Sequence, residues 1–229
     1  MDRLEVTVAT ETVEDYLKAI FMLSRESPAG EAGMTRLAAM VGVATGTATA
    51  MAKKLAAAKL AKYERFGGVT LTPKGTKAAL NILRRHRLIE TFLVETLKLD
   101  WSVVHPEAER LEHAVSPVVL EALDALLGRP TLDPHGDPIP DANGRIRAGH
   151  DLPLSNCVAG SKVRIARIAD QDEAFLLLVA RHGLKPGARV TVRGVDAPAQ
   201  SITVEAEGAA PVTLALAAAE KILAEHAWA

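Results

Sequence analysis

The sequence lacks cysteine pairs, long apolar runs and a strong net charge, and each absence excludes a class of protein. Its single cysteine, Cys157, excludes an internal disulfide framework and a zinc site built from several thiolates. In LPLSNCVAGSKV we expect a small residue at a strand edge rather than a nucleophile. No apolar run approaches the ~20 residues of a membrane span, and the acidic N-terminus lacks the apolar core of a secretory signal. We therefore expect a cytoplasmic protein without membrane contact.

The charge distribution is more informative than its sum. A formal net charge of −1 argues against the uniformly basic surface of a non-specific nucleic-acid-binding protein. The segment 53–65, however, carries five basic residues against the single acid Glu64: Lys53, Lys54, Lys59, Lys62 and Arg65. Such a run is usually a solvated helix face, so it indicates DNA binding only if the fold places it on a DNA-facing element.

The N-terminal third predicts three helices followed by a hairpin. Apolar positions at helical spacing over 13–25 predict the first helix. TRLAAMVG, with Thr35 as its cap and Gly42 in the turn, predicts a short second helix, and ATGTATAMAKKLAAAKL predicts a third. AKYERFGGVTLTPKG predicts two strands joined at Gly67-Gly68. This order is typical of a winged helix.

The remainder divides into a helical part, an irregular segment and a strand-rich part. Helices are predicted over 75–98, at HPEAERLEH and over 117–127. RPTLDPHGDPIPDANGRIRAGHD contains four prolines and three glycines, so we interpret it as a segment crossing between domains. SKVRIARI, ARVTVRGV and QSITVEAE alternate apolar and polar residues and predict a small β-barrel.

The HPEAERLEH helix gathers potential metal ligands on one face. At ~100° per residue, His105, Glu109, Glu112 and His113 fall within about a third of the helix circumference. A second pair, His86 and Glu90, is separated by one helical turn. The adjoining face should be buried, and its members are Val104, Ala108, Leu111 and Val115. The pattern fits a metal-binding face or, equally well, an amphipathic helix with a charged flank, so the choice depends on the rest of the chain.

Several motifs occur together in a recognisable order: VEDYLKAI, LTPKG, RRHRLIE, HPEAERLEH, HGDPIP and GLKPG. Together they resemble the diphtheria-toxin-repressor family of metal-dependent transcriptional regulators, in its three-domain form with a manganese-type primary site. The resemblance covers nearly the whole chain and implies a mainly α fold with a small β domain. It implies a winged helix-turn-helix DNA-binding domain over 1–74, a helical dimerisation and metal-binding domain over 75–140, a linker over 141–154 and an SH3-like (FeoA-like) barrel over 155–229.

The resemblance also implies two groups of metal ligands, and thus up to two metal ions per subunit. Matching positions of the primary site are Asp15, Glu109, Glu112 and His113, while His86, Glu90 and His105 are available for an ancillary site. An acidic residue of the C-terminal domain, Asp172 or Glu173, is a further candidate.

The ligand types bear on the choice of metal. Iron-responsive members have methionine and cysteine where this chain has Asp15 and Glu109. Carboxylates with imidazoles suit Mn²⁺, with Fe²⁺ as the second choice. Manganese-type members carry a second carboxylate where this chain has Lys18, so a closely spaced dinuclear site of that kind is not expected.

These assignments predict a metal-dependent repressor of metal-homeostasis genes and not an enzyme. The metal should hold the winged helix in one orientation, so that a homodimer recognises a pseudo-palindromic site on double-stranded DNA. Side chains expected to contact bases are Thr45, Thr47 and Thr49, and those expected to contact phosphates are Lys53, Lys54 and Arg65. Family members with glutamine in place of Ala50 make an amide contact that this chain cannot make.

Two other functions compete with this one. A winged-helix regulator that senses an organic ligand would use the Glu/His face only as a salt-bridged surface. A metallohydrolase would use the same ligands to activate water, but the chain has no HExxH-type motif and a winged helix is not required for hydrolysis.

Overall fold

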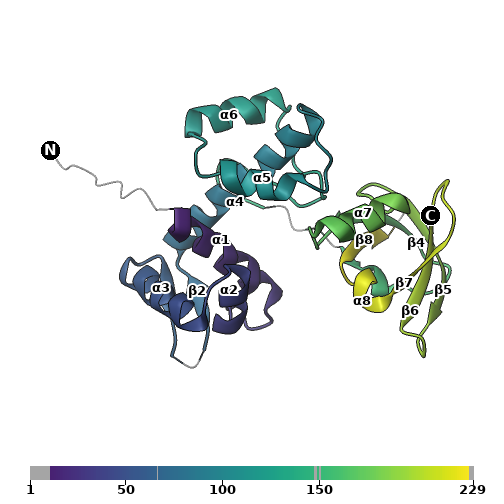
Figure 1. The fold of residues 1–229 in the computed structure, drawn as a ribbon, viewed down its shortest axis with the longest axis horizontal. Coiled ribbons are helices and arrows are strands. Elements are labelled where there is room, and N and C mark those ends of the chain that lie inside the picture. Colours follow the sequence, from purple (N-terminus) through teal and green to yellow (C-terminus); the bar gives the residue numbers. More distant parts are fainter. Residues whose placement is uncertain (1–10, 66, 147–148, 150, 227–229) are drawn as a thin grey trace. The chain divides into compact units, whose positions relative to one another are not determined.

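A computed structural model describes residues 11–65, 67–146, 149 and 151–226, and it divides the chain into two compact units (Figure 1). The first unit contains the described residues up to Arg85 together with Ala142–Arg145, and the second contains His86–Asp141 and the described residues from Ile146 onward. No described helix is both long enough and apolar enough to span a membrane.

The first unit is a winged helix-turn-helix. Leu17, Ile20 and Leu23 recur at helical spacing on α1 and pack with Leu37 of α2 and Leu55 of α3 in one buried core. The prediction that Thr35 caps α2 is wrong: Gly33 occupies the cap position without a side-chain hydrogen bond. The elements are α1 (Glu11–Glu26), α2 (Met34–Met40), α3 (Thr45–Ala57), β1 (Ala61–Tyr63), β2 (Val69–Leu71) and the first part of α4 (Pro73–Glu95).

The wing is the antiparallel β1–β2 hairpin. Val69 on β2 also forms a bridge with Ala32, which ties the hairpin to the segment before α2. Gly68 allows this close approach, because a Cβ atom there would lie 2.7 Å from the Ala32 carbonyl oxygen. The hairpin therefore stands at a defined position beside the helices of this unit.

The second unit begins within α4. Compared with the predicted 75–98 helix, α4 starts two residues earlier and also ends three residues earlier. Ile89 and Leu93 of α4 pack against Val104 and Ala108 of α5 (Val104–Leu111). Ser116 caps α6 (Pro117–Leu126) by accepting a hydrogen bond from Val119 N at 3.3 Å. Leu111 was predicted to be buried but is 43% exposed. It lies at the last position of α5, beyond the part of the helix that packs on α4.

The C-terminal part of this unit contains a six-stranded antiparallel sheet in the order β3-β8-β4-β5-β6-β7. Alternate residues such as Val163, Ile165, Ile202 and Val204 form its core, as the period-two pattern predicted, and Trp101 joins that core. Its elements are β3 (Leu152–Pro153), η1 (Leu154–Asn156), β4 (Lys162–Ile168), α7 (Glu173–Arg181), β5 (Arg189–Asp196), β6 (Ser201–Ala206), β7 (Val212–Ala215), α8 (Leu216–Ala219) and β8 (Ile222–His226). The expected fold class, mainly α with a small SH3-like β domain, is confirmed.

Cys157 differs from its expected place at a strand edge. It follows the short helical turn η1 and is buried in the core of the sheet domain, and this burial raises the pKa of its thiol. A buried thiol with a raised pKa is a poor nucleophile, which supports the expectation that Cys157 does not act as one.

Candidate metal centres and DNA-binding surface

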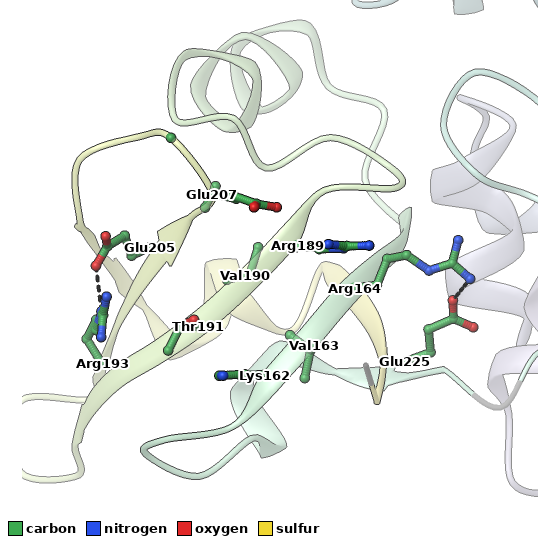
Figure 2. Close-up of a pocket in the computed structure, with 12 residues that line it drawn as sticks. Lys162, Val163, Arg164, Arg189, Val190, Thr191, Arg193, Glu205, Glu207 and Glu225 are labelled. Atoms are coloured by element: carbon green, nitrogen blue, oxygen red, sulfur yellow. Dashed lines mark hydrogen bonds and ion pairs between the residues drawn. The ribbon is translucent and has the colours of Figure 1, made fainter. Parts of the chain in front are cut away.

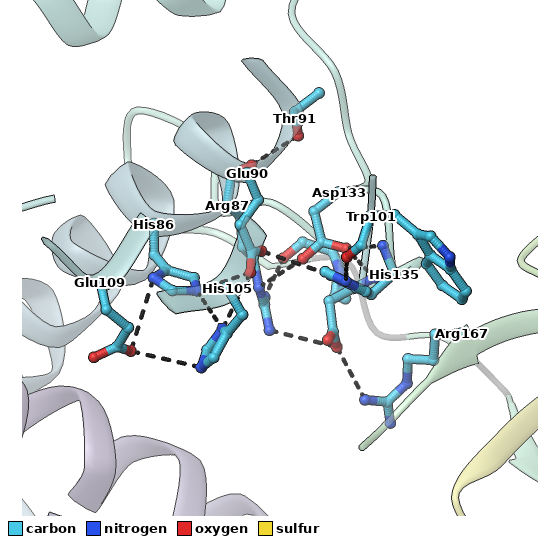
Figure 3. A network of polar contacts seen from close by, with 12 residues as sticks. His86, Arg87, Glu90, Thr91, Trp101, His105, Glu109, Asp133, His135 and Arg167 are labelled. Atoms are coloured by element: carbon cyan, nitrogen blue, oxygen red, sulfur yellow. Dashed lines mark hydrogen bonds and ion pairs between the residues drawn. The ribbon is translucent and has the colours of Figure 1, made fainter. Parts of the chain in front are cut away.

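His86 on α4 connects two helices through both of its ring nitrogens (Figure 3). Its Nδ1 lies 2.6 Å from Glu112 Oε2, at the end of α5, and its Nε2 lies 3.0 Å from Glu90 Oε1, one turn later on α4. His105 Nδ1 also lies 3.0 Å from His86 Nε2 and 3.1 Å from Glu90 Oε1. Imidazoles and carboxylates thus meet on the facing sides of α4 and α5.

His86 and His105, together with Glu109, form what we call the outer group. Glu109 Oε1 lies 3.9 Å from His86 Nδ1 and 3.8 Å from His105 Nε2. Glu109 and His105 are partly exposed, so an ion has access to this group from solvent. The two remaining residues of the HPEAERLEH face are more enclosed: Glu112 is fully buried, and its Oε1 lies 3.6 Å from His113 Nε2.

A second group, the inner group, consists of Glu90, Asp133 and His135, whose ligand atoms lie within 4.8 Å of one another. All three side chains are fully buried. Reasoning from the sequence named Glu90 but missed Asp133 and His135, because 129–151 has no periodic pattern that would indicate which side chains face α4. The signal that was present is the pair of potential ligands in DPH, whose histidine is also the first residue of the HGDPIP motif.

The hydrogen bonds of the inner group leave one ligand atom of each residue available. His135 Nε2 donates to the Trp101 carbonyl oxygen at 2.9 Å, which places the lone pair on Nδ1. Asp133 Oδ1 accepts backbone N–H groups from His135 at 2.8 Å and Asp137 at 3.0 Å. The remaining atoms, Glu90 Oε2, Asp133 Oδ2 and His135 Nδ1, have no hydrogen-bond partner among the described residues, and Asp133 Oδ2 lies 3.5 Å from Arg87 Nε in an ion pair.

Burial and mutual charge shift the pKa values of this group in different directions. Burial favours the protonated form of Glu90, but the positive field of His86 and the other imidazole contacts hold its pKa well below the usual value. Burial, with the nearby carboxylates of Glu90 and Asp137, raises the pKa of Asp133 to about 7. His135 is also buried, which opposes protonation, yet the Glu90 and Asp133 carboxylates raise its pKa.

These donors fit a divalent cation. Buried polar atoms without partners cost free energy, and oxygen and imidazole nitrogen are ligands suited to Mn²⁺, Fe²⁺ or Zn²⁺. The outer group offers the same donor types. Neither group contains a sulfur ligand, so a preference for soft ions has no basis in these residues.

Other predicted ligands lie elsewhere in the chain. Asp15 is on α1, in the first unit, and Lys18, one turn later, is buried. Asp172 caps α7 by accepting a hydrogen bond from Phe175 N at 3.0 Å, and Glu173 lies in the first turn of that helix. Among the described residues, neither Asp172 nor Glu173 belongs to a group of three potential ligands.

The predicted DNA-binding residues lie on α3 and in the wing. Thr45, Thr47, Lys53 and Lys54 are exposed on α3, and Arg65 is exposed in the turn between β1 and β2. Thr49 is half-buried and its hydroxyl donates to the Thr45 carbonyl oxygen at 2.8 Å. The basic run of 53–65 therefore does lie on the second helix of a helix-turn-helix and its wing, which was the condition for reading it as a DNA-binding surface.

A groove of about 680 Å³ lies on the C-terminal sheet (Figure 2). Its charged lining is of both signs, and Arg164 pairs with Glu225 while Arg193 pairs with Glu205. Its described lining residues include no histidine, so this groove differs chemically from the two ligand groups.

Three family models match successive parts of the chain. Residues 9–69 match the N-terminal DNA binding domain of the iron dependent repressors, residues 72–141 their metal binding and dimerisation domain, and residues 152–226 the FeoA domain. The chain is 30% identical to the iron-dependent repressor IdeR of Mycobacterium leprae over 220 residues, which cover 89% of this chain and 92% of that protein. It is 33% identical to the transcriptional regulator MntR of Bacillus pumilus over 109 residues, 48% of this chain and 74% of that protein.

Solved structures are similar over nearly the full length. A manganese-dependent transcriptional repressor in complex with manganese is 39% identical with a TM-score of 0.87, and the match covers 93% of this chain and 99% of the other. The repressor ScaR with bound Cd²⁺ is 32% identical with a TM-score of 0.80, and the match covers 93% and 99% of the two chains. The helix-turn-helix, the two ligand groups and these matches lead to one conclusion: the chain belongs to the diphtheria-toxin-repressor family of metal-dependent transcriptional repressors.

Proposed function

We propose that this repressor responds to Mn²⁺, with Fe²⁺ as the alternative ion, and controls genes of metal homeostasis as a homodimer on double-stranded DNA. The observation that carries the choice of ion is the donor set of the outer and inner groups, which consists of carboxylate oxygens and imidazole nitrogens. Its named relatives are transcriptional repressors, which supports a regulator rather than an enzyme.

The proposed ligands fall into three sets. His86, His105 and Glu109 would hold an ion in the outer group, and Glu90, Asp133 and His135 would hold one in the inner group. Asp15, Glu112 and His113 complete the ligands that the resemblance implies. We leave Asp172 and Glu173 out of the proposal, because Asp172 already caps α7.

Linkage gives the proposed route from metal to DNA. A bound divalent cation would offset the repulsion among the carboxylates of Glu90, Glu109 and Glu112. A metal ion can favour DNA binding only if the protein binds the ion more tightly in its DNA-binding form. The affinity for DNA in the presence of metal and the affinity for metal in the presence of DNA then rise by the same factor. A tenfold gain in DNA affinity corresponds to about 1.4 kcal/mol of coupling.

On DNA, the exposed side chains of α3 would enter the major groove. Thr45 and Thr47 offer hydroxyl and methyl groups to base edges, while Lys53, Lys54 and Arg65 would pair with phosphates. Thr49 already donates its hydroxyl to its own helix, so it would act as an acceptor or through its methyl group. A homodimer presenting two such helices would select a pseudo-palindromic operator.

The test is DNA binding by chelator-treated protein on its own promoter region, followed by fluorescence anisotropy. We expect weak binding without metal and at least tenfold tighter binding with Mn²⁺, while Fe²⁺ added without oxygen ranks the two ions. Glu112→Gln should abolish the response, and Glu107→Gln, on the exposed side of α5, should keep it. Equal affinity with and without metal would reject the proposal and favour a regulator that senses an organic ligand.

A further inference from the structure

The loop of residues 133–138 supplies two of the three ligands of the inner group, and α4 holds one side of it. Arg87 follows His86 on α4 and is buried. Its Nη1 donates to the Pro138 carbonyl oxygen at 2.6 Å, and its Nη2 lies 3.4 Å from Asp137 Oδ1. The helix that carries Glu90 therefore also fixes the end of the loop.

The C-terminal sheet holds the other side of the same loop. Ile168 N on β4 donates to the His135 carbonyl oxygen at 2.9 Å. Gly136 has φ +87°, and a Cβ atom there would lie 2.1 Å from the Ala166 carbonyl oxygen. β4 has a bulge between Ile165 and Arg167 at this contact. Bulges redirect the side chains beside them, so the bulge helps to set the direction of the Arg167 side chain.

Arg167 brings the two sides together (Figure 3). Its Nη1 lies 3.1 Å from Asp137 Oδ1, the atom that Arg87 also approaches, and its Nε lies 2.6 Å from Asp151 Oδ2. Asp137 and Asp151 are both nearly buried, at 11% and 12% exposure of their side chains. An ion pair whose carboxylates are nearly buried is more ordered than a fully exposed surface pair, which contributes close to zero to the free energy of unfolding.

We propose that Arg167 is a positioning residue for the inner group: through Asp137 it fixes the 133–138 loop, so that the C-terminal sheet sets how tightly Glu90, Asp133 and His135 bind a divalent cation. This inference rests on the proposed metal-binding function of that group. Its physical basis is preorganisation, because residues that orient metal ligands from outside the coordination shell typically account for about 10–100-fold in metal affinity.

The experiment is a Mn²⁺ titration of the full chain, with bound ion counted by electron paramagnetic resonance. A Glu109→Ala background removes a ligand of the outer group and leaves the inner group intact. In that background Arg167→Met should weaken Mn²⁺ binding by about tenfold or more. Arg167→Lys, which keeps the positive charge, should retain most of the affinity.

Arg164→Met is the matched control, because Arg164 lies three residues earlier on β4 and pairs with Glu225 away from the loop. It should leave Mn²⁺ affinity unchanged. Thermal unfolding of the metal-free variants, followed by tryptophan fluorescence, to which the buried Trp101 contributes, shows whether either substitution loosens the sheet domain. The expected result is a loss of affinity in Arg167→Met with an unfolding midpoint close to that of Arg164→Met.

The outcomes separate the two proposals. Mn²⁺ binding that is lost in His135→Ala but unchanged in Arg167→Met overturns the role of Arg167 alone, and an equal loss in Arg164→Met does the same. If the Glu109→Ala protein binds no Mn²⁺, or binds it equally well after His135→Ala, the inner group is not a metal site, and the role of Arg167 falls with it. The proposed regulation of DNA binding is tested separately, by the response of the parent protein and of Glu112→Gln to Mn²⁺.

Discussion

Glu90 on α4 and His135 in the 133–138 loop face each other with both side chains fully buried, and Glu90 Oε2 lies 3.8 Å from His135 Nδ1. The distance is longer than a hydrogen bond, so the two ligand atoms face each other without satisfying each other. The other oxygen of Glu90 contacts His86 and His105 of the outer group. Glu90 thus belongs to the inner group and also contacts two members of the outer group, so its charge acts on both.

Glu90→Gln should therefore affect metal binding at both groups. The amide keeps the volume of the side chain but removes the charge that offsets a bound cation. We expect calorimetry to show the loss of at least one Mn²⁺ per chain and at least a tenfold weaker remaining site. Glu107→Gln, which alters an exposed pair with Arg110, is the control and should bind Mn²⁺ as the parent does. Full stoichiometry and affinity in Glu90→Gln would show that this carboxylate is not a ligand.

Gly136→Ala should destabilise the protein more than Gly160→Ala does. Both glycines have φ +87°, so each substitution carries the backbone strain of a positive φ, on the order of 1–3 kcal/mol. Only at Gly136 would the added Cβ atom also clash with the backbone, at 2.1 Å from the Ala166 carbonyl oxygen, whereas a Cβ atom at Gly160 would meet nothing within 4 Å. Urea unfolding followed by tryptophan fluorescence measures the difference. Equal losses in the two variants would mean that the Gly136 contact with β4 adds nothing to stability.

Lys53→Ala should weaken binding to specific and non-specific DNA alike. An exposed lysine on α3 contributes mainly by releasing a counterion from a phosphate, so the slope of log K against log salt should fall by about 1. Anisotropy titrations across a salt series measure this slope. Lys162→Ala, an exposed lysine on β4, serves as the control with an unchanged slope. A loss confined to one operator sequence would instead indicate that Lys53 reads a base.

Cys157 should react slowly with a disulfide reagent in the native protein. Burial raises the pKa of its thiol, which lowers the thiolate fraction at neutral pH, so the reaction rate should rise with pH at values above those of an ordinary thiol. The unfolded protein provides the reference, because its thiol returns to the ordinary pKa. Native and unfolded rates that rise over the same pH range would contradict the shift.

Local pattern was sufficient for most of the fold. The helical spacing of Leu17, Ile20 and Leu23 indicates α1, and the alternation of Val163 with Ile165 indicates β4, because each element exposes one face to its own core. Element ends were less predictable. The cap of α2 is Gly33 rather than Thr35, since a capping side chain is favourable but not obligatory.

The sequence by itself determined the winged helix, the strand-rich C-terminal part and the common face of His105, Glu109 and Glu112, because these follow from helix and strand periods that a single segment carries. Only the tertiary structure decided that Leu111 is exposed while Glu112 is buried, and that Asp133 and His135 face Glu90. The 133–138 loop has no period. Its side chains acquire their directions from contacts with α4 on one side and with β4 on the other, between residues far apart in the chain.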